Sequence, residues 1–248
     1  WMPAFAGMTG EAMSFFEEGD GLMYAFLTGP MFYLSIAVFV IGLLVRAVLY
    51  IKGLDWKLDR VAYRAHPKAG LKGAARSILF WLIPFGTRSW RVQPFMTVVF
   101  FVFHIGAVLV PLFLMAHNLV LEEKFGFSFF TLNPVLADIL TWGVVVSAVL
   151  LVLRRIALPE VRILTTAYDY FILALSAAPF VTGLICRYAG AESYSGWLIA
   201  HIIAGELLLI LAPFTKLSHI VLYFMSRAQI GMDFGIKRGG LKGNDMAW

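Results

Sequence analysis

Five apolar stretches in this chain are each long enough to cross a lipid bilayer as a helix. A spanning helix needs about 20 apolar residues, because the hydrocarbon core is about 30 Å thick. Backbone hydrogen bonds must be satisfied within the bilayer, which favours helices. The sequence therefore predicts an all-α integral membrane protein, a five-transmembrane-helix bundle. Its predicted spans are Met31–Ile51, Phe95–Ala116, Val135–Leu153, Tyr170–Ile185 with its flanks, and Trp197–Phe224.

The composition also indicates a protein that contacts a lipid bilayer. Of its residues, 60% are hydrophobic and only 14% are charged, which differs from a soluble domain. The apolar segment Ser77–Gly86 is too short to cross and contains Pro84, so we expect an interfacial helix there. Cys186 is the one cysteine. It excludes an internal disulfide and any cysteine-ligated zinc or iron–sulfur site within this chain.

Lysine and arginine gather on alternate connections, which predicts orientation by the positive-inside rule. The segment between the first two spans, the connection from the third to the fourth, and the C-terminal tail are basic, whereas the other connections are acidic. We expect the N-terminus outside and the C-terminus in the cytoplasm, in the bacterial inner (cytoplasmic) membrane. Because the cations flank membrane spans, no nucleic-acid partner is expected.

This topology divides the chain into a periplasmic N-terminal segment (1–29), a five-helix membrane domain (30–226) with a cytoplasmic loop (52–93), and a cytoplasmic tail (227–248). The opening WMPAFAGMTG resembles peptides translated from bacterial intergenic repeats, and we expect translation to start at Met8 or Met13. No cleavable signal peptide is expected, because a positively charged n-region is lacking.

Four histidines fall on the predicted spans, where an unpartnered polar side chain costs several kcal/mol. His104 and His117 lie on the second span, and His201 and His219 on the antiparallel fifth. Depth then matches His104 with His219 near the cytoplasm, and His117 with His201 near the outer face. Two such pairs suit two bis-histidine b haems, because each iron takes one imidazole from each side of the porphyrin.

The spacing of the histidines supports this interpretation on one span more than on the other. His201 and His219 are eighteen residues apart, about five turns of a regular helix, so both leave one face. His104 and His117 are thirteen residues apart, which leaves them about 140° apart around a regular helix. Pro111 lies between them and can kink the helix. Two glycines, Gly106 and Gly205, either leave room for a macrocycle or serve helix packing.

The motif PFTKLSH on the last span, its preceding histidine, the paired histidines of the second span and the order of five helices resemble the gamma subunit of respiratory nitrate reductase. The loop KLDRVAYRAHPKAGLKGAARSILFWLIPFGTRSW resembles more closely the cytochrome b subunits of sulfur-metabolism transmembrane complexes of Tmc and Dsr type. The resemblance covers most of the chain, although the nitrate reductase pattern has a shorter second-span spacing.

This resemblance implies a dihaem cytochrome b, the electron-transfer subunit of a quinone-linked oxidoreductase complex that is not catalytic alone. It implies two haem b, with His117 and His201 as axial ligands near the outer face and His104 and His219 near the cytoplasm. Its partners would be quinone, a heterodisulfide-reductase-like iron–sulfur subunit on the cytoplasmic side, and a periplasmic cytochrome c.

Three further charged residues lie near these histidines. Lys216, one turn before His219, would contact a haem propionate, or else reach the lipid headgroups. Lys124, beside Glu122 and Glu123, would donate to a quinone near the outer haem, and a solvated acidic loop is the alternative. Glu206 on the fifth span is either a proton carrier or a buried hydrogen-bond anchor.

Two other classes of function remain open. A transporter or channel subunit would line a proton or ion path with the histidines and Glu206, although no internal repeat is visible and the number of spans is odd. A plain membrane anchor would bind no haem. His66, in the basic loop, is expected to be an ordinary surface or partner-contact residue.

Overall fold

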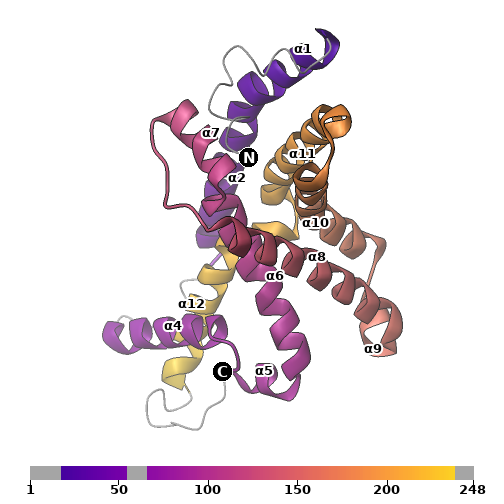
Figure 1. Ribbon diagram of the computed structural model, residues 1–248. Helices are drawn as coiled ribbons and strands as arrows, with labels where there is room; N and C mark the ends of the chain where they lie inside the picture. Colours follow the sequence, from indigo (N-terminus) through magenta and orange to yellow (C-terminus); the bar gives the residue numbers. More distant parts are fainter. Residues whose placement is uncertain (1–17, 55–65, 238–248) are drawn as a thin grey trace. The chain divides into compact units, whose positions relative to one another are not determined.

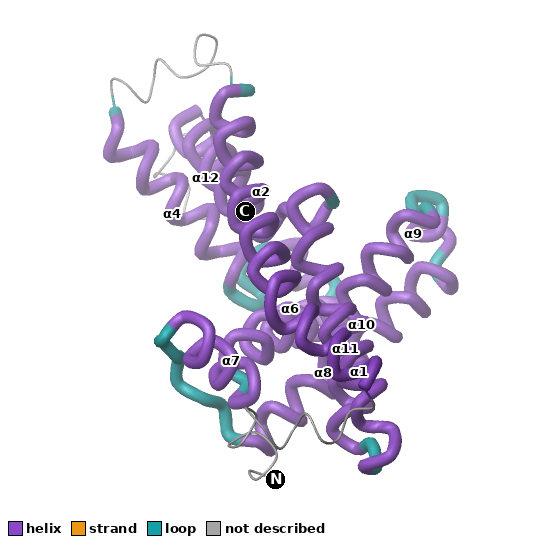
Figure 2. Tube along the Cα trace, turned by 90° about the horizontal axis from the view of Figure 1, so that it is seen from above, coloured by secondary structure: helices purple, strands orange, loops and turns teal. Residues whose placement is uncertain are grey.

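The computed structural model describes residues 18–54 and 66–237, and every regular element among them is helical (Figures 1 and 2). In chain order the elements are α1 (Glu18–Phe26), η2 (Leu27–Met31), α2 (Phe32–Lys52), α4 (Pro67–Leu82), α5 (Arg88–Val92), α6 (Pro94–Phe113), α7 (Met115–Phe125), α8 (Pro134–Ala157), α9 (Pro159–Arg162), α10 (Ala167–Tyr188), α11 (Ala191–Leu211), η3 (Ala212–Phe214), η4 (Lys216–Ser218) and α12 (His219–Lys237).

Five helical segments of the described chain are long and apolar enough to cross a membrane, which confirms the predicted number of spans. They are Gly21–Lys52, Pro94–Phe113, Pro134–Ala157, Ala167–Tyr188 and Ser193–Phe214. Large apolar side chains along them are exposed on the protein surface, among them Ile41 on α2 and Ile139 on α8. Such a surface is stable against lipid rather than water.

The predicted fifth span, Trp197–Phe224, is not one helix. It ends at Leu211, passes through the short 3₁₀ segments η3 and η4, and resumes as α12 at His219. Pro213 has no N–H to continue the helical ladder, and the Thr215 hydroxyl accepts from the Leu217 N–H and caps η4. The regular five-turn spacing of His201 and His219 therefore does not hold. The predicted tail from residue 227 is helical as far as Lys237.

The predicted interfacial helix Ser77–Gly86 corresponds to α4, which begins ten residues earlier. Pro67 stands at its first turn, where a missing N–H costs nothing. The helix ends at Leu82, and the backbone of Ile83 is extended, as expected for a residue before a proline.

The chain divides into two compact units. Unit 1 consists of Trp1–Ile36 and Val99–Ile210, and unit 2 of Ala37–Val98 and Leu211–Trp248. The core of unit 1 joins α6, α8 and α10 through Phe103, Val110, Val144, Ala148 and Phe180. Within it a Cβ on Gly106 would lie 2.4 Å from Val144 Cγ2, so this glycine serves helix packing.

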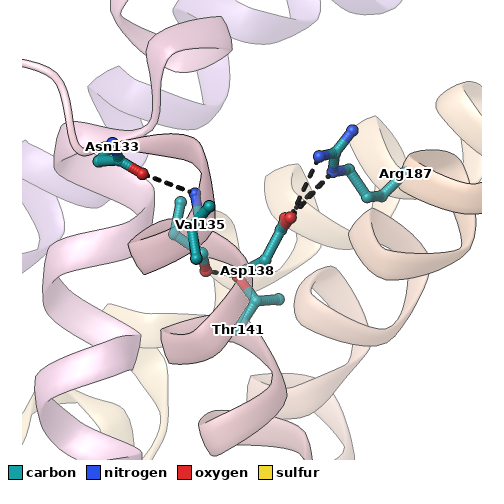
Figure 3. Close-up of polar contacts among 6 residues, drawn as sticks. Asn133, Val135, Asp138, Thr141 and Arg187 are labelled. Atoms are coloured by element: carbon teal, nitrogen blue, oxygen red, sulfur yellow. Dashed lines mark hydrogen bonds and ion pairs between the residues drawn. The ribbon is translucent and has the colours of Figure 1, made fainter.

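Polar contacts at one end of α8 help to place it beside α10 (Figure 3). The Asn133 side chain accepts from the Val135 N–H and caps α8, as asparagine commonly does at a helix start. Arg187 on α10 donates to both carboxylate oxygens of Asp138 on α8, with Nε–Oδ1 and Nη2–Oδ2 distances of 3.1 Å. This bidentate pair ties the two helices together.

In unit 2 the helices α4 and α12 lie side by side (Figures 1 and 2). A Cβ on Gly231 would come within 2.3 Å of the Gly73 carbonyl oxygen, so the glycines allow a close approach. Arg227 donates to the Ser77 hydroxyl at 2.8 Å, and its guanidinium lies 4.6 Å from the centre of the Trp81 ring.

Candidate histidine site

A helix break after the second span determines where His117 lies. Helix α6 ends at Phe113, Leu114 has extended backbone (ψ 134°), and α7 begins at Met115 (Figure 1). A break leaves carbonyl oxygens of the last turn without helical partners. The Pro111 carbonyl oxygen is one of these, and it lies 3.0 Å from His117 Nδ1. The sequence predicted a kink at Pro111, whereas the actual interruption is at Leu114.

Asn118 satisfies further groups at this break. It is 2% exposed, and its amide nitrogen donates to the carbonyl oxygens of Leu112 and Leu114 at 3.0 and 3.1 Å. Its Oδ1 accepts from the Phe129 N–H at 2.6 Å. Gly126, with a positive φ of 74°, ends α7, and the chain then returns along the break. Asn118 therefore holds α7 in place and, with it, His117.

The imidazoles of His117 on α7 and His201 on α11 lie together in unit 1. Their ring planes are inclined by 9°, and their centroids are 6.0 Å apart. Two imidazoles that bind one metal ion through bonds of about 2 Å have centroids about 6 Å apart. The two imidazoles are therefore neighbours at a distance compatible with one shared metal ion, and their role as axial ligands of one iron stays a prediction.

Helix α10 supplies the surroundings of His201. His201 Nδ1 lies 2.9 Å from the Pro179 carbonyl oxygen and 3.2 Å from Thr182 Oγ1. A Cβ on Gly183 would lie 3.2 Å from His201 Cε1 and 3.4 Å from Nδ1, tighter than ordinary van der Waals contact. Neither Thr182 nor Gly183 was predicted as a site residue.

Of the four histidines predicted at membrane depth, His104 and His201 lie within the candidate spans, whereas His117 and His219 lie beyond the span ends. All four have Nδ1 against a backbone carbonyl. His104 Nδ1 lies 2.8 Å from the Phe100 oxygen, and His219 Nδ1 lies 2.9 Å from the Lys216 oxygen. A carbonyl oxygen only accepts, so Nδ1 must carry the proton and the lone pair is on Nε2. This is the tautomer that binds a metal through Nε2, and a carbonyl partner on Nδ1 is the usual support for a metal-bound imidazole.

The second predicted pair is divided between the two units. His104 is in unit 1, against the Phe100 ring with centroids 4.0 Å apart, and His219 is in unit 2. The pairing of His104 with His219 stays a prediction. Lys216 is exposed, and its carbonyl oxygen is the partner of His219 Nδ1.

Lys124 and Glu206, which the sequence also singled out, differ in their polar contacts. Lys124 donates to its neighbour Glu123 at 2.9 Å, and the adjacent Phe125 ring contacts the rings of Phe32 and Phe127. The buried Glu206 is 5% exposed, and within the described part of the chain its Oε1 has no hydrogen-bond partner.

Gly205, the glycine beside Glu206, differs from Gly106. Apart from its own helix backbone, no described residue would lie within 4 Å of a Cβ on Gly205, which leaves room there for a bulky group. No group of three or more metal-ligating His, Cys, Asp or Glu side chains occurs within residues 18–54 and 66–237. A bis-histidine haem requires only two protein ligands.

The five bilayer-length apolar helices define the class of this chain, a multi-pass helical membrane protein. No protein-family model matches it. It is 65% identical over 218 residues to a protein of Nitratidesulfovibrio vulgaris (strain Hildenborough), a match that covers 88% of this chain and 96% of the relative. The chain therefore belongs to the family of that protein. The relative is described only as a protein, so its description adds no function.

Proposed function

We propose that this protein is a membrane cytochrome b subunit that carries electrons between the quinone pool and partner subunits through two b haems. The observation that carries the proposal is the pair His117 and His201, nearly parallel with centroids 6.0 Å apart and each with Nδ1 on a proline carbonyl. These two residues would hold the outer haem, and His104 and His219 the inner one. Bound haem b supplies one-electron redox chemistry.

The residues of the chain contribute ligation and orientation. The carbonyls of Pro111 and Pro179 hold the Nδ1 protons, which orients each ring and increases the basicity of Nε2. Lys216 would meet a propionate of the inner haem. At the outer end, Lys124 would donate to a quinone carbonyl, while a neighbouring carboxylate moves the proton. The next residue, Phe125, contacts the Phe32 ring and would offer an aromatic surface to the quinone.

Orientation and partners complete the proposal. With the N-terminus outside and the C-terminus in the cytoplasm of the bacterial inner membrane, the inner haem would face an iron–sulfur subunit that resembles heterodisulfide reductase. A periplasmic cytochrome c would meet the outer side. The chain would act within a quinone-linked oxidoreductase complex.

The test is the absorption spectrum and haem content of the purified protein. We expect a b-type α band after reduction and two non-covalent haems per chain. His117→Ala and His201→Ala should each retain one haem, and the retained haem should be the inner one in both variants. The control His66→Ala should retain two haems. A colourless wild-type protein would refute the proposal. If the wild-type protein held one haem, and His201→Ala lost that haem, only the proposed inner site would be refuted.

The burial of Glu206 favours a second candidate, a proton or ion path. Ionisable residues within membrane spans recur in the proton and ion paths of pumps and transporters. In that case Glu206→Gln would abolish proton movement into vesicles that contain the protein, and the protein would be colourless.

A further inference from the structure

We infer that Thr182 is a positioning residue that tunes the outer haem through His201, an inference that rests on the proposed function. Thr182 lies on α10, a helix that carries no histidine. Its hydroxyl oxygen is 3.2 Å from His201 Nδ1. The role follows from which atom donates each hydrogen bond in this small group.

The Thr182 hydroxyl has one proton, and two carbonyls are within its reach. It donates to the Ala178 oxygen at 2.8 Å, with the Pro179 oxygen farther away at 3.2 Å. The Pro179 carbonyl requires that His201 Nδ1 carry a proton. The Thr182 oxygen can then only accept from that Nδ1–H, so the proton is shared between two acceptors.

His117 has a simpler arrangement, since the Pro111 carbonyl is the one acceptor at its Nδ1 among the residues that the structure describes. Each acceptor on Nδ1–H increases the electron density that an imidazole gives to a metal. His201 is therefore the stronger donor of the two. Because electron donation stabilises the oxidised iron, Thr182 lowers the reduction potential of the outer haem.

The experiment is a redox titration of the haems in Thr182→Val, which removes the hydroxyl and nearly keeps the shape. We expect one of the two midpoint potentials to rise and the other to stay, with Thr182→Ser close to wild type. Thr141→Val is the matched control, because Thr141 makes the same bond to the carbonyl four residues earlier, at 2.7 Å, and bonds to no histidine within residues 18–54 and 66–237. Unchanged midpoints in Thr182→Val, or an equal rise in Thr141→Val, would overturn the inference.

A second measurement separates this inference from the proposed function. The measurement is NMR of haem-free protein labelled with ¹⁵N-histidine, in which His201→Gln identifies the signals of His201. The proton signal of the His201 Nδ1–H should move upfield in Thr182→Val. It should not move in Thr141→Val. A colourless protein with this shift would refute the cytochrome and keep the contact, whereas no shift would refute the contact itself.

Discussion

The Asn118 side chain donates a hydrogen bond to the Leu112 carbonyl oxygen at 3.0 Å, across the break between α6 and α7. The same amide accepts from the Phe129 N–H. One buried side chain thus replaces the helical partners that the break removes, and the adjacent His117 depends on it.

Asn118→Leu should therefore destabilise the protein and release the proposed outer haem. Each buried polar group left without a partner costs about 1–3 kcal/mol. Thermal unfolding and haem content measure the two effects. Asn133→Ala is the control, since it removes an exposed helix cap worth about 1 kcal/mol and should keep both haems. Full haem content in Asn118→Leu would mean that the break holds without this amide.

Gly183→Ala should weaken the proposed outer haem site. The new methyl group would lie 3.2 Å from His201 Cε1, so the imidazole must move. We expect lower occupancy of the haem that His201→Ala removes, measured by pyridine haemochrome. Gly196→Ala on α11 meets no atom within 4 Å and should stabilise its helix by about 0.5–1 kcal/mol. Equal haem content in both variants would contradict this prediction.

The Asp138–Arg187 pair should contribute measurably to stability. Its side chains are only 31% and 27% exposed, and the contact is bidentate. Asp138→Asn should lower the free energy of unfolding by about 1–2 kcal/mol. Glu123→Gln breaks the more exposed pair with Lys124 and should cost less than about 1 kcal/mol. Comparable losses in both variants would argue against a special role for the α8–α10 contact.

Topology can be tested by labelling single cysteines after Cys186→Ala. His66→Cys should react with an impermeant thiol reagent only from the cytoplasmic side, and Glu122→Cys only from outside, as the positive-inside rule requires. Both positions are exposed, which makes the two reactions comparable. Cytoplasmic labelling at position 122 would reverse the assignment of outer and inner haem.

Lys124→Ala should slow haem reduction by quinol while chemical reduction by dithionite stays normal. Loss of the ammonium removes the proposed donor to the quinone carbonyl, and at least a tenfold effect, about 1.4 kcal/mol, is expected. Arg88→Ala removes an exposed cation of unit 2 and serves as control. Normal quinol reduction in Lys124→Ala would move the quinone site elsewhere.

Hydropathy alone was sufficient to predict the five spans, because crossing a bilayer depends on length and apolar content, which are local properties of the chain. The choice of His117 and His201 as one pair also came from sequence, through depth matching of antiparallel spans. Pro213 and Thr215 indicate the helix break at Ala212–Ser218 in the sequence. The prediction missed this break because the apolar run around it is long enough to be interpreted as one span.

The geometry of the histidine site needed the tertiary structure. A regular helix places His104 and His117 about 140° apart, but the break at Leu114, held by Asn118 of the next helix, puts the two histidines on separate helices. Thr182 and Gly183 carry no motif, and their role depends on α10 packing against α11. Apolar content selects a membrane helix, but side-chain packing and unsatisfied carbonyls decide which face meets which neighbour.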